Sequence, residues 1–474
     1  MQQRRTPFSL KVNYEIDFFK QYQYLAQNET YHAFLESGRG GRYSIAGIKP
    51  IAIAKGKDEE LVVRHHDIQK TFLGNPLDSF QEWFQQFSTI NDPKLPDFQG
   101  GAIGFLSYDC VRYFEKLPNL AEDDLQTPDL YFMIFDDVAI YDHQESVLWL
   151  ITHTYNDDEK SAAYDKLNGM KAEWTSATQV NVLTSLDTPS IQMKKQLAFT
   201  EKTFMHAVEK IKSYIAQGDV FQINLSVRQD FPLTSDPMKI YEALRMINPS
   251  PYMGYLNFPE FQLVSSSPEL LVKKQGKNVS TRPIAGTRSR GRDEHHDQQL
   301  ANELIQNEKE RAEHVMLVDL ERNDLGRVCG YGTVHVNEFM VIEKYSHVMH
   351  IVSNVEGQLR DDCTYAELIK ATFPGGTITG APKVRTMQII EELEPTRRGI
   401  YTGSIGWIGF NGDTELNIII RTLLAKDGVG YVQSGAGIVI DSNPEHEYKE
   451  SLKKAKAMMK AVELSSEEKI LSLR

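Results

Sequence analysis

The chain is poor in cysteine, has no long apolar run and carries no excess of positive charge. Its only cysteines among 474 residues are Cys110, Cys329 and Cys363, and they show no CxxC spacing. This usage is typical of a reduced protein with ordinary buried thiols, and none of the three lies in the Gly-x-Cys-x-Gly motif of an amidotransferase nucleophile. The basic N-terminus is not followed by an apolar run, and no stretch approaches the ~20 apolar residues of a membrane span. We therefore expect a cytoplasmic protein that makes no membrane contact.

The charge balance is acidic, with a formal net charge of −13 and a pI near 5.5. A nucleic-acid-binding protein would present a basic face, so no nucleic-acid partner is expected. An anionic small molecule remains compatible with this composition, because a pocket can be locally positive in an acidic protein.

The sequence divides at one segment of low periodicity. Between Trp174 and Phe199 the chain turns to Ser, Thr, Gln and Lys, which is typical of a linker. We therefore expect four parts: an N-terminal region at 1–175, a linker at 176–198, a second region at 199–465 and a tail at 466–474.

Three helices of the second region are predicted from local patterns. Residues 301–318 predict one amphipathic helix and residues 382–393 another. The last helix has the clearest start, because Asn443 can cap it and Pro444 fits its first position.

Two pairs of glutamates recur at helical spacing. Glu310 and Glu313 form the first pair and Glu447 and Glu450 the second, and residues three apart share one face of a helix. Carboxylates without sulfur ligands suit a hard cation such as Mg²⁺, which takes one or two carboxylates and completes its shell with water and substrate oxygens. The alternative is that each pair lies on a solvated helix face, because glutamate is usually exposed.

Glycines and an arginine in an apolar run indicate a candidate anion site. Residues 433–440 contain Gly435 and Gly437 and predict a loop whose N–H groups could hold an anion, the alternative being turn geometry alone. Arg421 follows three isoleucines and is predicted inside an apolar strand, where its anionic partner would be either a structural carboxylate or a substrate. His350 is predicted in a similar strand, where a lone histidine is more often structural than catalytic.

Motifs in a fixed order along nearly the whole chain resemble those of the chorismate-utilising enzymes. They are Ser267-Pro-Glu-Leu-Leu, Arg282-Pro-Ile-Ala-Gly-Thr-Arg-Ser-Arg-Gly, Arg311-Ala-Glu-His-Val-Met-Leu-Val-Asp-Leu-Glu-Arg-Asn-Asp-Leu-Gly-Arg, Tyr345-Ser-His-Val-Met-His, Gly380-Ala-Pro-Lys and Gly435-Ala-Gly. The resemblance implies an α+β fold, a two-subdomain sandwich of large, mostly antiparallel sheets flanked by helices, as in anthranilate synthase component I. It also implies that residues 199–465 form the chorismate-binding catalytic region.

The resemblance also implies roles for individual residues. Glu313 and Glu450 match the family's Mg²⁺ ligands, and Glu310 and Glu447 match the second carboxylates that hold metal waters or tune the site. Glu269 matches the acid that protonates the leaving C4 hydroxyl of chorismate. An active-site histidine and the remaining substrate contacts are matched by His350, Gly286, Thr287, Thr377, Tyr401, Arg421, Gly435, Ala436, Gly437 and Lys454.

Gln222 indicates an aminating member of the family. Relatives that add water carry a lysine base at this position, whereas glutamine cannot deprotonate water and ammonia needs no such base. One aminating branch places the amine at C4 and keeps the enolpyruvyl group, for p-aminobenzoate and folate synthesis. The other, anthranilate synthase component I, aminates C2 and eliminates pyruvate.

The branch is predicted from conflicting motifs. Ala285 is typical of the C2 branch, but 374–383 and 401–407 resemble the C4 branch, a subset of which keeps alanine here. We therefore expect C4 amination, with C2 amination as the alternative and a non-catalytic sensor on the same scaffold as a less favoured one. Because no glutaminase thiol is visible, ammonia is expected from a separate class I glutamine amidotransferase subunit.

Two further segments resemble the tryptophan pocket of anthranilate synthases, which both branches can retain. Its candidate residues are Glu36, Ser37, Pro251, Tyr252 and Met253. The alternative is a turn that is simply packed by its prolines and Tyr252.

Overall fold

The protein is described from a computed structural model, in which residues 5–38, 40–155, 159–176, 196–197, 199–345 and 348–465 are placed. Most of the predicted linker 176–198 and the whole predicted tail 466–474 lie outside these described residues.

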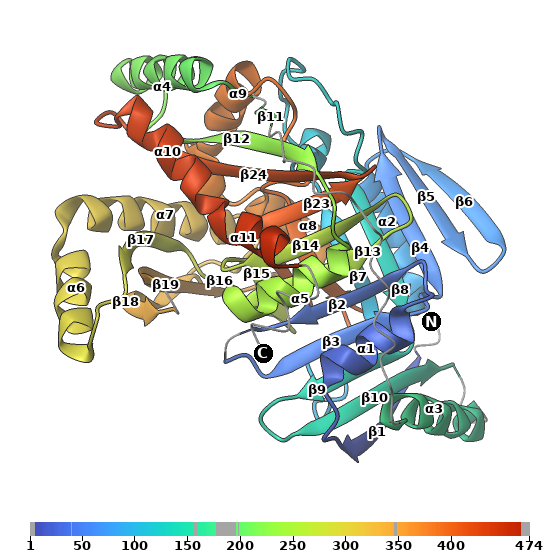
Figure 1. Cartoon of the computed structure of the whole chain (residues 1–474). Helices are drawn as coiled ribbons and strands as arrows, with labels where there is room; N and C mark the ends of the chain where they lie inside the picture. The colour runs from blue at the N-terminus through green and yellow to red at the C-terminus, as the bar shows by residue number, and fades with distance from the viewer. Residues whose placement is uncertain are drawn as a thin grey trace.

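Two large antiparallel sheets form the frame of the molecule (Figure 1). The first sheet contains, in spatial order, β1 (Thr6–Asn13), β10 (Val147–Thr154), β9 (Val138–Asp142), β3 (Tyr43–Ile48), β2 (His32–Glu36), β13 (Tyr252–Asn257), β14 (Phe261–Ser267), β23 (Thr422–Lys426), β24 (Val429–Ile438), β12 (Gln222–Pro232) and β11 (Gln196–Leu197), with β20 (Gly380–Ala381) paired to β12. The second contains β17 (Ile284–Ser289), β19 (Val348–Gln358), β16 (Asn278–Thr281), β15 (Leu270–Gln275), β22 (Thr414–Ile418), β21 (Ser404–Gly409), β7 (Gly101–Leu106), β8 (Leu130–Phe135), β4 (Ala52–Lys57), β5 (Glu60–His65) and β6 (Ile68–Leu73), with β18 (His335–Lys344) paired to β19.

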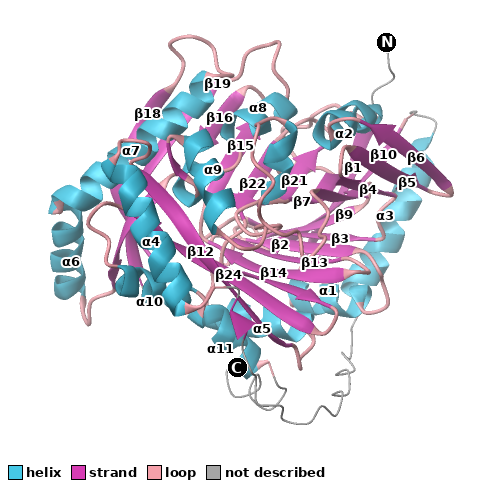
Figure 2. Cartoon of the chain, turned by 90° about the horizontal axis from the view of Figure 1, so that it is seen from above, coloured by secondary structure: helices cyan, strands magenta, loops and turns pink. Residues whose placement is uncertain are grey.

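Helices cover the outer faces of both sheets (Figure 2). They are α1 (Phe18–Ala26), α2 (Pro76–Phe84), α3 (Lys160–Thr175), α4 (Glu201–Ala216), α5 (Pro237–Ile247), α6 (Glu294–Gln306), α7 (Glu308–Gly326), α8 (Tyr365–Thr372), α9 (Lys383–Leu393), α10 (Pro444–Lys454) and α11 (Lys456–Leu464). Apolar side chains of α1, α3, α5 and α11 pack on the first sheet, and those of α2, α7 and α8 pack on the second. None of the helices in the described part of the chain combines the length and the apolarity needed to cross a membrane.

The two sheets pack against each other through a dry apolar layer. Phe105 and Tyr131 of the second sheet meet Leu256 and Leu263 of the first in this layer, and all four side chains are buried. Both sheets combine strands that precede residue 176 with strands that follow residue 198. The predicted α+β sandwich is therefore confirmed. The predicted division of the chain into an N-terminal region and a catalytic region stays a prediction, because strands from both regions share each sheet.

Two of the predictions about local structure need correction, and two others are confirmed. The helix predicted at 301–318 is interrupted, because the side chain of Asn307 accepts a hydrogen bond from the Glu310 N–H and so caps a new helix, α7. The predicted glycine loop at 433–440 is mostly strand, since Gly435–Gly437 belong to β24 and pair with β12. The helix predicted at 382–393 is found as α9, and Asn443 caps α10 with Pro444 in its first turn.

Arg421 does not lie inside a strand. It lies in the short connection between β22 of the second sheet and β23 of the first, where the chain passes from one sheet to the other. Its φ is +51°, a left-handed conformation that is uncommon for residues other than glycine and that concentrates at functional sites. The crossing therefore brings this guanidinium to the region between the sheets.

Candidate functional site

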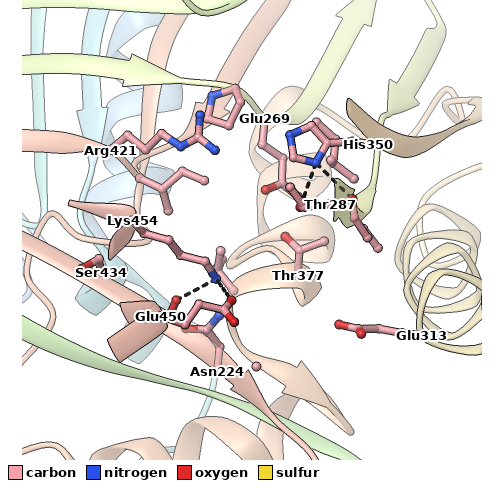
Figure 3. A pocket seen from close by; sticks show the side chains of 18 of the residues that line it. Asn224, Glu269, Thr287, Glu313, His350, Thr377, Arg421, Ser434, Glu450 and Lys454 are labelled. Atoms are coloured by element: carbon pink, nitrogen blue, oxygen red, sulfur yellow. Dashed lines mark hydrogen bonds and ion pairs between the residues drawn. The ribbon is translucent and has the colours of Figure 1, made fainter. Parts of the chain in front are cut away.

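A cavity of about 510 Å³, called the main cavity below, gathers most of the predicted site residues. Both sheets contribute to it, together with α7, α10 and the short 3-10 turn η4 (Gly376–Ile378). The predicted residues that line it are Glu269, Gly286, Thr287, Glu310, Glu313, His350, Thr377, Tyr401, Arg421, Gly435, Gly437, Glu447, Glu450 and Lys454. Figure 3 shows Glu313 at the right of the cavity and Glu450 and Lys454 on the opposite side, with Arg421 and Glu269 above them in this view.

The two glutamate pairs line the cavity from different helices, Glu310 and Glu313 from α7 and Glu447 and Glu450 from α10. Burial raises the pKa of Glu313 and of Glu447, and in each case the neighbouring glutamate of the pair adds to the rise. Lys454 pairs with Glu450 at 3.1 Å between Nζ and Oε1. Accumulated negative charge of this kind favours binding of a cation.

No three His, Cys, Asp or Glu side chains in the described ranges are grouped closely enough to hold a metal ion by themselves. Glu310 accepts a hydrogen bond from Arg288 (3.0 Å), and Glu313 accepts one from Gln222 Nε2 (3.0 Å). A magnesium ion needs only one or two carboxylates when water and substrate oxygens complete its shell. The oxygen-only donors on α7 and α10 fit such a partly open site.

Arg421 lines the cavity and is half-buried, and its guanidinium makes no hydrogen bond or ion pair with the described residues, although Glu269 is near enough for its charge to act on it. Burial lowers the pKa of its guanidinium below the ordinary value. A buried guanidinium without a counter-ion is unfavourable, and its planar fork matches a carboxylate. This position can therefore receive an anionic ligand.

Glu269 is a buried acid in the same part of the cavity. Its side chain is 6% exposed, and its Oε1 has no hydrogen-bond partner among the described residues. Burial raises the pKa of Glu269 to about 7, although the Thr377 hydroxyl and the charges of Arg421 and Lys454 oppose the rise. A carboxyl group with this pKa is partly protonated at neutral pH and can donate a proton.

His350 is held by the neighbouring strand β17. Its Nδ1 lies 3.0 Å from the Thr287 hydroxyl and 3.1 Å from the Gly286 carbonyl oxygen, which can only accept a hydrogen bond. Burial lowers the pKa of His350 to about 4, so the ring is neutral at pH 7. Gly286 has a φ of +64°, and a Cβ there would lie 3.0 Å from Glu310 Oε2.

Two predicted residues lie beside the cavity rather than on its wall. Gln222 does not line the cavity, but its amide nitrogen donates a hydrogen bond to Glu313, which does line it. The side chain of Ala436 points away from the cavity into an apolar cluster under α4 and α9, because side chains alternate along β24. Its predicted role in shaping the substrate contacts stays a prediction, and it concerns the backbone of Ala436 rather than its side chain.

Some contributors were missed in the sequence. Asn224, two residues after Gln222, lines the cavity, and the period of two along a strand could have revealed it. Arg398 and Glu394 form a buried ion pair behind the wall, and Arg398 donates to the carbonyl oxygens of Asn224 and Ile378. The pair itself is local, its members being four residues apart, but its role behind the wall could not be predicted because Asn224 and Ile378 come from distant segments.

The five residues predicted for a tryptophan pocket line a second cavity of about 500 Å³. Glu36 is already engaged there, since its carboxylate accepts hydrogen bonds from Arg245 and from the Tyr241 hydroxyl (2.8 Å each). Ser37 and Tyr252 remain on the wall of this cavity.

Comparisons with known proteins agree with the motifs. A family model described as chorismate binding enzyme matches residues 24–460. The chain is 59% identical over 470 residues to aminodeoxychorismate synthase component 1 of Bacillus subtilis (strain 168), covering 99% of each chain. It is 43% identical over 447 residues to anthranilate synthase component 1 of Acetivibrio thermocellus, covering 91% of this chain and 90% of that one.

The fold is similar to a solved structure of anthranilate synthase component I from Streptococcus pneumoniae TIGR4. The TM-score is 0.80 at 35% identity, and the match covers 88% of this chain and 92% of that one. The predicted family and the predicted fold are both confirmed by these matches. The chain belongs to the family of chorismate binding enzymes.

Proposed function

We propose that this chain is a cytoplasmic enzyme that aminates chorismate at C4 in a Mg²⁺-dependent reaction, giving 4-amino-4-deoxychorismate for p-aminobenzoate and folate synthesis. The observation that carries the proposal is that one cavity is lined both by Arg421, a half-buried guanidinium that makes no hydrogen bond or ion pair with the described residues, and by Glu269, a buried acid. The 59% identical relative named aminodeoxychorismate synthase component 1 supports the choice of reaction.

In the proposed reaction, Arg421 binds the enolpyruvyl carboxylate of chorismate and Tyr401 packs beside it. Gly435 and Gly437 let the backbone of β24 approach the substrate, and Lys454 adds a positive charge at the wall. Together these groups offset the negative charge of a dianionic substrate as it leaves water.

Glu269 acts as the general acid. It gives its proton to the C4 hydroxyl, which leaves as water, while ammonia adds to the ring and loses one proton. The balance is one chorismate and one ammonia consumed, and one aminodeoxychorismate and one water formed. His350, neutral and fixed through Nδ1, orients the ring without supplying a charge.

Glu313 and Glu450 would hold Mg²⁺, with Glu447 and Glu310 in support. The ion would supply positive charge against the ring carboxylate of chorismate. The carboxylates of α7 and α10 are otherwise crowded by like charge, which is the observation in favour of a cation.

The ammonia is proposed to come from a separate class I glutamine amidotransferase subunit. The nucleophile of such a subunit is a thiolate, whereas burial raises the pKa of Cys110 and raises that of Cys329 to about 11. Gln222 cannot act as a base toward water, which favours ammonia over water as the nucleophile.

Anthranilate synthase chemistry remains the second candidate because of one observation. Ala285 lines the main cavity and cannot form a covalent bond to the ring, so ammonia itself must attack. Enzymes that aminate C2 typically carry the same alanine at this position.

A product assay tests the proposal. The chain is incubated with chorismate, Mg²⁺ and ammonium, and the products are separated and identified by mass and fluorescence. We expect aminodeoxychorismate, with p-aminobenzoate forming only after a lyase is added. Direct formation of anthranilate would refute C4 amination in favour of C2 amination, and absence of any product would refute an enzymatic role.

Removing either proposed metal ligand should abolish most turnover. Glu313→Gln and Glu450→Gln keep the size of the side chain but remove its charge, so Mg²⁺ loses a ligand. Glu310→Gln should weaken metal affinity less, by about 10- to 100-fold. The matched control is Glu445→Gln, an exposed residue of the same helix α10. The measurement is activity as a function of magnesium concentration, with circular dichroism to verify folding. Wild-type activity in both Glu313→Gln and Glu450→Gln would contradict their assignment as metal ligands.

The pH dependence should follow Glu269. The acid must be protonated, so kcat should be constant below its pKa of about 7 and fall as pH rises through that value. His350 is neutral throughout this range and should not contribute. Rates are measured at a constant concentration of free ammonia, because ammonium also loses its proton at high pH. Glu269→Gln should lower the rate by about 10²–10⁴-fold and remove the pH dependence; a wild-type rate in this variant would exclude the acid.

We propose further that the second cavity binds tryptophan. Its volume of about 500 Å³ and the aromatic ring of Tyr252 on its wall support an aromatic amino acid there. Added tryptophan should then raise the thermal unfolding midpoint by mass action, and phenylalanine should do so less. Equal unfolding midpoints with and without tryptophan would refute tryptophan binding and favour the alternative, a turn packed by its prolines and Tyr252.

A further inference from the structure

Thr402 lies in the turn before β21, in a backbone conformation that suits glycine rather than threonine. Its φ is +59°, and it is 1% exposed. Among the non-glycine residues with a positive φ in the described part of the chain, it is the only β-branched one and the only buried one. A β-branched residue in this region is strained, and it persists only where the surrounding structure holds it. A turn that needed this shape alone could contain glycine, so the threonine calls for a further explanation.

The hydroxyl of Thr402 joins two groups behind the wall of the main cavity. It accepts a hydrogen bond from Arg398 Nη1 (3.2 Å) and donates one to the carbonyl oxygen of Tyr401 (2.6 Å). Arg398 is fixed by its ion pair with Glu394, and its guanidinium lies 5.5 Å from the centroid of the Tyr401 ring. Glycine, alanine and valine have no hydroxyl and would lose both hydrogen bonds. The hydroxyl therefore ties the peptide bond after Tyr401 to a buried ion pair.

The backbone of the same turn is bonded to the segment that leads to Arg421. The Thr402 N–H donates to the carbonyl oxygen of Ile419 (2.8 Å), and the Ile419 N–H donates to the carbonyl oxygen of Gly403 (2.9 Å). Ile419 precedes Arg421 by two residues, and Arg421 is itself left-handed, with a φ of +51°. The turn and the crossing between the sheets are therefore fixed to each other beside two residues that line the cavity, Tyr401 and Arg421.

Tyr401 and Arg421 depend on this backbone for their placement. Neither the Tyr401 hydroxyl nor the Arg421 guanidinium makes a hydrogen bond or an ion pair with the described residues. Polar contacts of their own therefore do not anchor these side chains, and a shift of the turn would move the Tyr401 ring relative to the guanidinium. In the proposed reaction Arg421 binds the enolpyruvyl carboxylate with Tyr401 packed beside it, so their relative position decides how well that group fits.

We propose that Thr402 is a positioning residue for chorismate: its hydroxyl holds the left-handed turn against Arg398, and the turn sets the position of Tyr401 relative to Arg421 for the enolpyruvyl carboxylate. The inference rests on the proposed function, whose substrate is chorismate. Thr402 acts through its neighbours, since it is not among the residues that line the main cavity. The strain is retained because the left-handed φ brings the hydroxyl between the Arg398 guanidinium and the Tyr401 carbonyl oxygen.

Kinetics of hydroxyl variants test the positioning role. Thr402→Val keeps the β-branch and the approximate volume of the side chain and removes the hydroxyl, whereas Thr402→Ser keeps the hydroxyl. The KM for chorismate should rise about threefold to tenfold in Thr402→Val, as expected for a lost hydrogen bond, and stay within about twofold of wild type in Thr402→Ser. The kcat should change by less than about twofold in both, because the enolpyruvyl carboxylate is bound alike before and during the reaction.

A second pair of variants separates the hydroxyl from the strain. Thr402→Gly and Thr402→Ala both lack the hydroxyl, but only glycine is free of strain at a φ of +59°. Thr402→Gly should therefore have a higher thermal unfolding midpoint than Thr402→Ala, while both show the same rise in the KM for chorismate as Thr402→Val. A wild-type KM in Thr402→Gly would mean that only the shape of the turn matters, and would overturn the role of the hydroxyl.

The matched control is Thr152→Val. Thr152 is an equally buried threonine on β10 whose hydroxyl donates to Asp137 (2.6 Å), and it does not line the main cavity, so its kinetic constants should equal those of wild type. An unchanged KM in Thr402→Val, an equal rise in Thr402→Ser or in Thr152→Val, or a fall in kcat without a rise in KM would overturn the positioning role alone. A wild-type chain that does not turn over chorismate with ammonium would overturn the proposed function, and this inference with it.

Discussion

The buried ion pair between Glu394 and Arg398 is the contact on which the geometry of the main cavity depends. The two side chains are 3% and 1% exposed and lie 2.8 Å apart. Removing one partner at this depth would leave an uncompensated charge, at a cost of about 3–5 kcal/mol. Arg398 also donates to the carbonyl oxygens of Asn224 and Ile378, and Glu394 accepts from the N–H and hydroxyl of Ser226. One pair thereby ties β12 to the turn that carries Thr377.

A cavity wall that is fixed by this ion pair can keep polar groups unpaired in the absence of a ligand. Glu269 Oε1 and Asn224 Oδ1 are buried acceptors without donors among the described residues, and the half-buried Arg421 has no directly bonded anion there. Each is unfavourable by itself, so a flexible wall would close on them. The main cavity therefore combines a cation, an acid and an amide acceptor on its wall.

The glutamate pairs and the caps illustrate what local sequence predicts well. Glu310 and Glu313 share a face of α7 as their spacing requires, and Asn443 caps α10 because its side-chain oxygen reaches an N–H of the first turn. Predictions failed where long-range pairing overrode local propensity. Gly435–Gly437 form strand because β12 supplies a partner. The 301–318 prediction failed for a local reason instead, because Asn307 caps α7 by accepting from the Glu310 N–H.

The sequence by itself determined the family, the α+β class, the helical glutamate pairs and the residue types of the site, since these follow from motifs and from periodicity within single segments. Only the tertiary structure decided that α7 and α10 face one cavity, that Arg421 enters it where the chain crosses between sheets, and that Asn224 belongs to its wall. The pKa of Glu269 also belongs to this second group. The physical reason is that burial, charge and unpaired hydrogen-bonding groups depend on atoms from distant segments, which no local pattern contains.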